Sequence, residues 1–472
     1  MSTSEQPERI DHQRNRVTVV GLGYLGATHA ICMAKLGHRV IGVDVDADKV
    51  AALQDGALPF HEPGLQEELS GALATHRLSF TTDFDRAVEH GDTLFVCVGT
   101  PQKEGTDAAD LTFVDAAFDA LAARLTRRAL IVGKSTVPVG TAQRLARRVA
   151  AASPAGDDVE VAWNPEFLRE GFAVEDTLHP DRLVFGVASD WALRRLTQVL
   201  GPVLSTGVPA IVCDLPTAEL VKVAANAFLA TKISFINAMA EICEAAGADV
   251  GLLAQALGHD SRIGSRFLKP GLGFGGGCLP KDIRAFAHRA EELGVGGTLT
   301  FLREVDQVNL RRRARMVDLI RELADGDLRG KRIAALGASF KPDSDDVRDA
   351  PALEVARMLA MEGAHVRVYD PAAAANAHRI YPDLDYAASL AAAVDDADVV
   401  ALLTEWQEFI DADPESMGRH VRHRRVADGR RVLDAARYRL AGWDYRALGG
   451  PERIVSVPEE NRTGEFPATA LR

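Results

Sequence analysis

The stretch RVTVVGLGYLGATHAICMAKLGHRVIGVD, residues 16–44, decides the fold class. It opens with mostly β-branched residues that predict a strand, and residues 39–44 predict a second strand. Between them, a glycine-rich turn leads into small and apolar residues that are typical of a helix. This order predicts a βαβ unit, in which a crossover helix joins two parallel strands.

The glycines and the acid that ends this unit predict a dinucleotide site. Gly21 permits a tight turn, Gly23 lets the backbone approach a pyrophosphate, and Gly26 lets helix and strand pack closely. The free N–H groups at the helix start then face the phosphates. Asp44, at the end of the second strand, can accept hydrogen bonds from the ribose hydroxyls and repels a 2′-phosphate. We therefore expect NAD rather than NADP, although the glycines alone would also suit an ordinary turn.

The rest of the chain continues this alternation and then breaks it. Further strands are expected at residues 93–100, 129–136, 159–165 and 182–187, separated by helical stretches. Such alternation predicts a mostly parallel, doubly wound sheet. Residues 217–246 contain neither glycine nor proline and predict one long helix, which opens a mainly helical middle part.

A second α/β unit begins near residue 330. Its expected strands are residues 331–342, 365–371, 396–406 and 430–436, with a helix at 350–364. The predicted fold class is therefore α/β, with two Rossmann-like doubly wound domains joined by a central helical domain that contains a long helix. The predicted parts are a disordered N-terminus (1–14), an NAD-binding domain (15–213), a central catalytic and dimerisation domain (214–328), a C-terminal nucleotide-binding domain (329–458) and a flexible tail (459–472).

Composition argues against several classes of protein. The chain has 472 residues and a net charge of -13, which disfavours general affinity for nucleic acid or an anionic membrane. We find no apolar run long enough to span a bilayer, and the polar N-terminal residues lack a signal-peptide core. The five cysteines are scattered, without a CxxC pair or zinc-like spacing. We expect a reduced, cytoplasmic protein with no metal, nucleic-acid or membrane partner.

One face of the predicted long helix carries polar residues. Lys222 and Asn226 lie four residues apart and share this face, and Asn237 falls on the same stripe. An ammonium group and an amide that point together into a cleft can stabilise a developing oxyanion. A solvated polar face is the alternative interpretation, but the residues around the stripe are almost all apolar. We therefore expect this face to be buried at a site.

The segment GFGGGCLPKD, residues 273–282, places Cys278 directly after a run of glycines. It suits either a flexible linker with a stray thiol or a backbone shaped to hold a ligand against a nucleophile. A helix with proline in its first turn is expected next, so Cys278 would lie near a helix N-terminus. Lys222 and Lys281 are candidates to stabilise the thiolate and lower its pKa. Asp282 could transfer a proton or orient a water.

More polar side chains follow the expected parallel strands, at the edge where open α/β sheets bind ligands. They are Ser135, Thr136, Thr141, Glu166 and Glu170 in the first unit, and Lys341 and Arg348 in the second. Acid–base residues gathered at such an edge indicate a proton-transfer site. Each of them taken alone suits an ordinary polar loop equally well.

Together these motifs resemble the UDP-glucose/GDP-mannose dehydrogenase family of nucleotide-sugar dehydrogenases. GLGYLG, STVPVGT, NPEFLREG, the Lys-x-x-x-Asn helix, GFGGGCLPKD and FKPDSDDVR occur in the family's order, and the resemblance covers residues 16–457. It implies oxidation of the C6 primary alcohol of a nucleotide sugar to a carboxylate by NAD, with UDP-glucose expected first. It also implies a covalent route through a thiohemiacetal and a thioester on Cys278.

The resemblance further implies roles for individual residues. The implied catalytic residues are Cys278 as nucleophile, Lys222 and Asn226 on oxyanions, Asp282 and Thr136 on a water in proton transfer, and Glu166 in thioester hydrolysis. The implied NAD contacts are Gly21, Gly23, Tyr24, Leu25, Gly26, Asp44, Lys49, Thr100, Thr136, Glu170 and Arg348. The implied substrate contacts are Glu166, Phe167, Leu168, Lys222, Asn226, Arg262, Lys269, Phe274, Gly275, Lys341 and, more weakly, Arg430 or Arg431.

Two further features come from the same resemblance. In family members the arginine that matches Arg262 can reach into a neighbouring subunit's site, which implies a homodimer or a higher homo-oligomer through the central helix. Gly277 departs from the family, because many relatives carry serine before the cysteine. Any role of that hydroxyl is therefore absent in this chain.

Other functions remain open from the sequence. Another nucleotide sugar, GDP-mannose first, suits the same motifs. A single-step dehydrogenase of the 6-phosphogluconate or hydroxyacid type also uses a Rossmann domain and a lysine–asparagine helix, but it needs no thiol and no third domain. A non-enzymatic NAD-binding regulator would not need Lys222, Asn226, Cys278 and Asp282 together.

Overall fold

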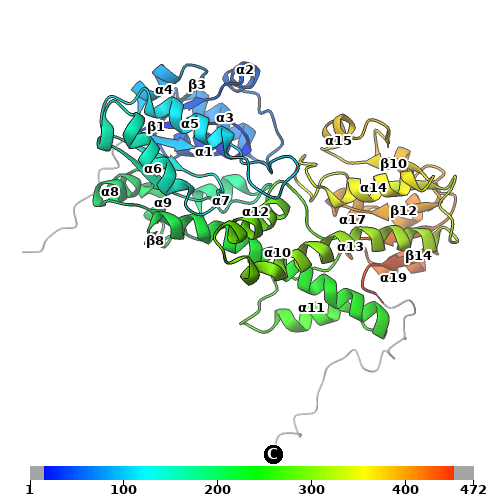
Figure 1. Cartoon of the computed structure of the whole chain (residues 1–472). Coiled ribbons are helices and arrows are strands. Elements are labelled where there is room, and N and C mark those ends of the chain that lie inside the picture. Colours follow the sequence, from blue (N-terminus) through cyan, green and yellow to red (C-terminus); the bar gives the residue numbers. More distant parts are fainter. Residues whose placement is uncertain (1–14, 451–472) are drawn as a thin grey trace, which may run out of the picture.

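The structure is a computed structural model that describes residues 15–450. The expected tails, residues 1–14 and 459–472, lie outside this range, as does the end of the expected C-terminal domain. Figure 1 shows two sheet-containing units, one in blue to teal and the other in yellow to red, with a group of helices in green between them. The predicted α/β class with two Rossmann-like units is confirmed, because both sheets are largely parallel and doubly wound.

The N-terminal sheet has eight strands in the order β3-β2-β1-β4-β5-β6-β7-β8. β1 pairs in parallel with β2 and with β4, so that Val17 lies opposite Val40 on one side and Thr93 on the other. The first six strands have the order of a dinucleotide-binding fold, whose crevice opens between β1 and β4. The strands are β1 (Arg16–Val20), β2 (Arg39–Val43), β3 (Leu78–Thr81), β4 (Thr93–Val96), β5 (Ala129–Gly133), β6 (Val159–Trp163), β7 (Leu183–Gly186) and β8 (Ala210–Cys213).

Helices cover both faces of this sheet, because side chains alternate along each strand. Val17 and Val19 of β1 pack in one core with α1, α3 and α8, whereas Val20 packs in the other with α4, α5 and α6. The helices are α1 (Tyr24–Lys35), α2 (Ala47–Gln54), α3 (Leu65–Ala74), α4 (Phe84–His90), α5 (Thr112–Ala122), α6 (Thr141–Ala152), α7 (Ala173–Leu178), α8 (Asp190–Val199) and α9 (Gly201–Leu204), with a 3-10 turn at Gly156–Asp158.

The middle of the chain is helical, and α10 is the predicted long helix. Its 32 residues span about 48 Å. It starts after Asp214, whose carboxylate accepts a hydrogen bond from the Thr217 amide at 2.8 Å, and it ends at Gly247, which has φ 71°. α10 packs against α12 and α13. The helices here are α10 (Leu215–Ala246), α11 (Val250–Gly258), α12 (Leu279–Glu292) and α13 (Thr300–Leu323), with a 3-10 turn at Gly296–Leu299.

By length and composition alone, α10 is apolar enough to cross a membrane, contrary to our expectation that no run of the chain is. Its inward face, however, buries Glu219, Lys222, Asn226 and Asn237, each of which pairs with another segment of the protein. Paired polar groups on a buried face are typical of a core helix that carries a functional site.

The C-terminal sheet has six parallel strands in the order β11-β10-β9-β12-β13-β14, which repeats the winding of the first sheet. Its strands are β9 (Arg332–Leu336), β10 (His365–Tyr369), β11 (Asp385–Tyr386), β12 (Val399–Leu402), β13 (Arg425–Asp428) and β14 (Asp444–Ala447). Its helices are α14 (Pro351–Met361), α15 (Ala374–Ile380), α16 (Leu390–Val394), α17 (Gln407–Asp411), α18 (Pro414–Met417) and α19 (Ala435–Leu440).

One expected strand of this unit is wrong. Residues 430–436 form a loop and the start of α19, and the strand β13 lies just before them. The buried Asp428 carboxylate explains the loop, because it accepts hydrogen bonds from the amides of Arg430, Arg431, Val432 and Leu433 at 2.7–3.0 Å. Those amides are therefore not available to pair with a neighbouring strand.

Candidate active site

The glycine turn after β1 has the geometry that a dinucleotide needs. Gly21 adopts φ 86°, which side chains other than hydrogen rarely allow. A Cβ built on Gly26 would lie 1.7 Å from the carbonyl oxygen of Gly21, so the close turn requires glycine there as well. Nothing lies within 4 Å of a Cβ built on Gly23. The start of α1 is therefore open to a pyrophosphate.

Asp44 follows β2 and holds the other side of this turn. Its two carboxylate oxygens accept hydrogen bonds from the amides of Leu22 at 2.6 Å and Asp46 at 3.0 Å, and the Lys49 ammonium lies 3.1 Å away. Burial opposes ionisation, but these donors outweigh it and lower the pKa of Asp44 below its usual value. An ionised carboxylate at this place suits the ribose of NAD, so the residues present fit that cofactor.

Glu62 is a residue that sequence reasoning missed. Its buried carboxylate accepts hydrogen bonds from the amides of Gly171 and Ala173, both at 2.7 Å, and from the hydroxyl of Tyr24. It thereby caps α7 and joins the dinucleotide turn to the segment that follows β6. Burial and this acid raise the pKa of Tyr24, so its hydroxyl stays a hydrogen-bond donor. A lone acid between turn residues gave no sequence signal for this role.

Cys278 lies at the N-terminus of α12, as predicted. It is the residue before the first helical position, its carbonyl oxygen accepts from the Asp282 amide at 3.0 Å, and Pro280 stands in the first turn. Lys281 and Asp282, which follow the thiol in the sequence, form an ion pair here. Asp282 is buried, and the Lys281 ammonium lies 2.5 Å from its carboxylate.

The polar face of α10 meets this helix start. The Asn226 amide donates a hydrogen bond to the second carboxylate oxygen of Asp282 at 2.6 Å. The buried Lys222 ammonium lies 2.9 Å from the Glu166 carboxylate, which follows β6. Three segments far apart in the sequence thus bring Glu166, Lys222, Asn226 and Asp282 together beside Cys278. Asn237, expected on the same stripe, instead accepts a hydrogen bond from the Gly271 amide at 2.9 Å and supports the glycine loop.

The pKa values of Lys222 and Cys278, the two central groups of this cluster, both shift upward. Burial lowers the pKa of Lys222, but Glu166, Cys278 and Asp282 outweigh it, so the net shift is upward and the ammonium stays charged. Solvent reaches Cys278, yet protein surrounds the thiol closely enough that desolvation raises its pKa to about 11. Asp282 adds to this rise, and Lys222 opposes it. The expected lowering of the thiol pKa is therefore wrong, because burial of the thiol, helped by the Asp282 carboxylate, outweighs the nearby lysines.

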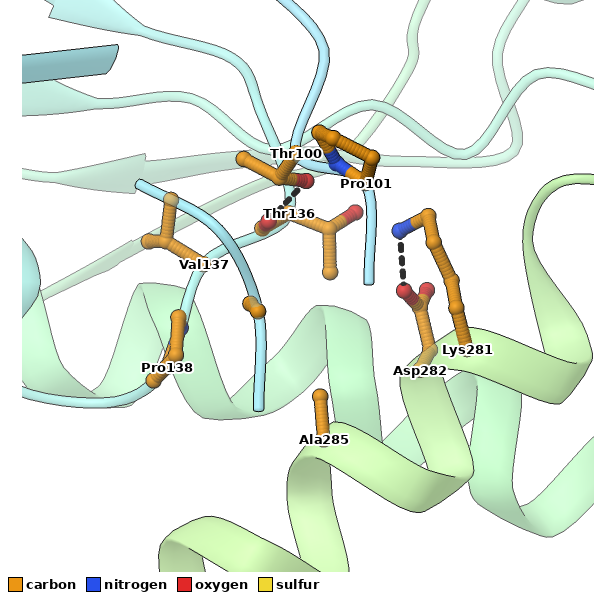
Figure 2. Close-up of a pocket in the computed structure, with 9 residues that line it drawn as sticks. Thr100, Pro101, Thr136, Val137, Pro138, Lys281, Asp282 and Ala285 are labelled. Carbon is orange, nitrogen blue, oxygen red and sulfur yellow. Dashed lines mark hydrogen bonds and ion pairs between the residues drawn. The ribbon is translucent and has the colours of Figure 1, made fainter. Parts of the chain in front are cut away.

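Thr136 and Asp282 face the same narrow pocket from opposite sides, as Figure 2 shows. The hydroxyl of Thr100 donates to the carbonyl oxygen of Thr136 at 2.8 Å and fixes the loop that follows β5. The pocket measures about 10 Å³, which is room for about one water. It lies between the two strand-end loops of the NAD-binding unit and the start of α12.

Glu219 is a second residue that sequence reasoning missed. It lies three residues before Lys222 on α10, and its carboxylate accepts hydrogen bonds from the amides of Gly140 at 2.7 Å and Ala142 at 2.6 Å. These amides begin α6, directly after the Thr136 loop. Burial raises the pKa of Glu219 to about 7 despite those bonds. Its position on the expected polar face of the long helix was a usable signal.

Glu170 joins the two Rossmann-like units. Its backbone carbonyl accepts a hydrogen bond from the Lys341 ammonium at 2.6 Å, and its carboxylate accepts one from Ser344 at 3.0 Å. The Arg348 guanidinium lies 3.6 Å from the same carboxylate and 2.6 Å from that of Asp346. The structure thus places Glu170, Lys341 and Arg348 together, at the junction where the resemblance puts cofactor and substrate.

The glycine loop is packed against other parts of the protein along its length. A Cβ on Gly273 would lie 2.2 Å from Asn309, one on Gly275 2.3 Å from the Asp349 carbonyl oxygen, and one on Gly276 2.8 Å from the Phe340 ring. Asn309 also accepts from the Phe274 amide at 2.7 Å and donates to its carbonyl oxygen at 2.9 Å. The loop is therefore a fixed junction and not a linker, and its glycines accommodate protein groups at these positions.

Arg430 reaches this loop from the C-terminal unit. Its guanidinium donates to the carbonyl oxygens of Leu403 at 2.7 Å, Gly273 at 3.1 Å and Phe340 at 3.3 Å. Arg431 instead pairs with Asp249 at 2.8 Å, away from the loop. Of the two arginines, only Arg430 therefore adjoins the candidate site.

The structure separates two of the expected residues from the cluster. The Arg262 side chain is 87% exposed and pairs with the neighbouring Asp260 at 2.7 Å. Lys269 is also exposed. The remaining expected contacts lie at the site: the Lys222 ammonium sits over the Phe167 ring, and the Leu168 amide donates to Glu166 at 2.8 Å. Leu25 is half-buried in the first turn of α1.

Comparison with known proteins matches the whole described arrangement to one family. Models of the UDP-glucose/GDP-mannose dehydrogenase family match residues 15–203 (NAD binding domain), 216–311 (central domain) and 334–435 (UDP binding domain). The chain is 40% identical to the UDP-glucose 6-dehydrogenase of Rhizobium meliloti, over 93% of this chain and 100% of that protein. It is 39% identical to the UDP-glucose 6-dehydrogenase TuaD of Bacillus subtilis, over 97% and 98%.

A solved structure gives the same result. The UDP-glucose dehydrogenase of Pyrobaculum islandicum superposes with a TM-score of 0.86 at 38% identity, over 94% of this chain and 99% of that one. Fold, site and relatives together define an NAD-dependent nucleotide-sugar dehydrogenase. Its NAD-binding part contains the glycine turn and Asp44. The chain belongs to the UDP-glucose/GDP-mannose dehydrogenase family.

Proposed function

We propose that this protein oxidises UDP-glucose to UDP-glucuronate, with Cys278 as covalent catalyst. The observation that carries the proposal is the convergence of Lys222, Asn226 and Asp282 on the helix start that bears the thiol. A dehydrogenase that stops at the aldehyde or ketone needs no such thiol. The names of the relatives support UDP-glucose as the substrate.

Two oxidations convert a primary alcohol to a carboxylate, and bound NAD⁺ supplies the hydride acceptor for each. In the first, the C6 hydroxyl loses its proton toward the Thr136–Asp282 pocket, where a water between the two residues relays it. Lys222, which stays protonated, and the Asn226 amide stabilise the negative charge that develops on the sugar oxygen. The aldehyde is the product of this step.

Cys278 then captures the aldehyde. The thiol gives its proton to the Asp282 side of the site and the sulfur forms a bond to C6, and the carbonyl oxygen takes up a proton from that side and becomes the hydroxyl of a thiohemiacetal. Because burial raises the pKa of the thiol to about 11, only a small fraction of thiolate is present near neutral pH, and Lys222 stabilises that fraction. Loss of a second hydride from C6 and of the hydroxyl proton leaves a thioester. Glu166 then takes a proton from the water whose oxygen bonds to C6, and the sulfur leaves, takes up a proton and becomes the free thiol again.

In this proposal, different sets of residues hold the cofactor and the substrate. NAD is held by the glycine turn, Asp44, Lys49, Thr100 and the Glu170–Arg348 pair. The nucleotide sugar is held by Phe167, Leu168, Phe274, Gly275, Lys341 and Arg430.

We place the domain divisions at residues 213 and 328, which fall between β8 and α10 and between α13 and β9. A reduced, cytoplasmic setting would keep Cys278 free.

We also propose a homodimer through α10. Phe228, Phe235 and Ile242 recur every seven residues along this helix and are 67%, 50% and 58% exposed. Such a stripe on a long helix suits a second copy of the same helix. The exposed Arg262 would then be free to reach the partner's site. Phe235→Glu, which puts a negative charge into this stripe, should convert the dimer to a monomer in sedimentation analysis, and an unchanged mass would contradict this.

A panel of nucleotide sugars tests the substrate, and Cys278→Ser tests the thiol. UDP-glucose should give the highest kcat/KM, whereas a preference for GDP-mannose would replace the proposed substrate and leave the chemistry intact. Cys278→Ser should bind UDP-glucose with nearly unchanged affinity and lose at least about a thousandfold in turnover. Turnover near the wild-type rate would contradict the covalent role.

A further inference from the structure

Gly277 is a glycine for a different reason from its neighbours. Gly273 and Gly276 have positive φ, and Gly275 lies against backbone, but Gly277 lies outside the left-handed region and its backbone would accept any side chain. What a Cβ there would meet is the guanidinium of Arg348, whose carbon lies at 2.3 Å and nitrogens at 2.5 and 2.6 Å from it. The space that this residue leaves is filled by a cation.

Arg348 is held in that space from several sides. Its carbonyl oxygen accepts from the Gly276 amide at 2.9 Å, which fixes its backbone to the loop. Its guanidinium donates to Asp346 at 2.6–3.0 Å and lies 3.6 Å from Glu170. The side chain is nevertheless 62% exposed, so a methyl group on Gly277 would displace the guanidinium without disturbing buried packing.

This guanidinium lies against the residue that precedes the thiol. The charged groups that face Cys278 are Asp282 and Lys281 from α12, Lys222 from α10, Glu166 after β6, and Lys341 and Arg348 from the segment after β9. The two carboxylates raise the thiol pKa, and the cations oppose them. Of these cations, Arg348 is the one whose approach depends on the absence of a side chain at position 277.

We propose that Arg348 is an electrostatic partner of the Cys278 thiolate, and that Gly277 is the positioning residue that admits it. The third domain thereby contributes directly to the reactivity of the thiol on the central domain. The effect of this contact on catalysis rests on the covalent role of Cys278 proposed above. Its effect on the reactivity of the thiol can be measured whether or not that role is correct.

The test is the rate at which iodoacetamide alkylates Cys278 in the free enzyme, read by mass spectrometry of the Cys278 peptide. The charge of Arg348 is partly screened by water, so its removal should raise the thiol pKa by roughly half to one unit. Because a more basic thiolate is also more nucleophilic, the net loss of alkylation rate near neutral pH should be about two- to threefold. Arg348→Gln and Gly277→Ala should both show this loss, and Arg348→Lys should retain most of the wild-type rate.

The double variant separates the charge from the shape of the loop. In the Arg348→Gln background, Gly277→Ala should cause no further loss, because the guanidinium that it displaces is already gone. An equal further loss would show that the methyl group acts on the loop and would overturn the proposal. So would an unchanged alkylation rate in Arg348→Gln. Failure of the proposed covalent catalysis would appear separately, as turnover retained by Cys278→Ser.

Discussion

Replacing Asp282 by asparagine should make the thiol more reactive and the enzyme less active. The carboxylate of Asp282 raises the pKa of Cys278, second only to desolvation, and Asn226 and Lys281 both contact it. Asparagine has nearly the same size as aspartate, and its side-chain oxygen can still accept a hydrogen bond from the Asn226 amide. It lacks only the negative charge. Reactivity and turnover then respond in opposite directions, which no general loss of structure would produce.

The size of the change follows from the charges. With a thiol pKa of about 11, roughly one thiol in a thousand is ionised near pH 8. Loss of a carboxylate that Lys281 already half-neutralises should lower this pKa by about one unit, so about tenfold more thiolate forms. Each thiolate is then about threefold less nucleophilic, which leaves a net gain of about threefold in alkylation rate. Turnover should fall at least a hundredfold, because the proton relay is lost.

The assay compares iodoacetamide labelling of the Cys278 peptide with NADH formation in the same preparation. Asp306→Asn is a matched control, because Asp306 of α13 pairs at 2.9 Å with Arg284 of α12, the helix that carries Asp282, and is not among the groups that shift the pKa of Cys278. The control should leave the alkylation rate unchanged. Slower alkylation in Asp282→Asn, or turnover within a few-fold of wild type, would refute this account of the site.

Three further predictions concern other parts of the fold. Asp44→Ala should raise the KM for NAD at least tenfold and reduce the preference of the enzyme for NAD over NADP. An unchanged ratio of kcat/KM for NAD to kcat/KM for NADP would contradict the ribose role. Glu219 has a folded-state pKa of about 7, above the ordinary value of 4.5, so its contribution to stability is present at acid pH and is lost as pH rises through 7. Thermal denaturation between about pH 5 and pH 8 should therefore show a flatter profile for Glu219→Gln, and an unchanged slope would contradict this. Asn309→Ala removes both hydrogen bonds to Phe274, so kcat/KM for the nucleotide sugar should fall about tenfold while the KM for NAD stays constant, and equal effects on both substrates would indicate general unfolding.

Much of the fold could be predicted because its signals are local. β1, the glycine turn and β2 are set by β-branched residues and by positions where a Cβ would collide with backbone. α10 could be predicted from an uninterrupted helical run. The short strands β3, β8, β11 and β14, each of two to four residues, carry too little pattern and were not predicted. The strand expected at residues 430–436 was wrong because the carboxylate of Asp428, the last residue of β13, accepts hydrogen bonds from the amides of that segment.

The candidate site was harder to predict from the sequence, because it forms from residues that are far apart in the chain and meet only in the folded protein. Lys222 and Asn226 share a helix face by spacing, but their partners Glu166 and Asp282 come from other segments. The sign of the thiol pKa shift depends first on how deeply the fold buries the thiol and then on the nearby charges, and sequence order reveals neither. Glu62 bonds amides more than a hundred residues away.

The central claim is that one thiol converts an alcohol to a carboxylate in two oxidations at one site. The most direct measurement is the yield of NADH per UDP-glucose consumed, together with the uronate formed, under limiting sugar and excess NAD. The account predicts two NADH and one UDP-glucuronate per UDP-glucose, without free aldehyde. A yield of one NADH per sugar, with an aldehyde or ketone as product, would contradict it.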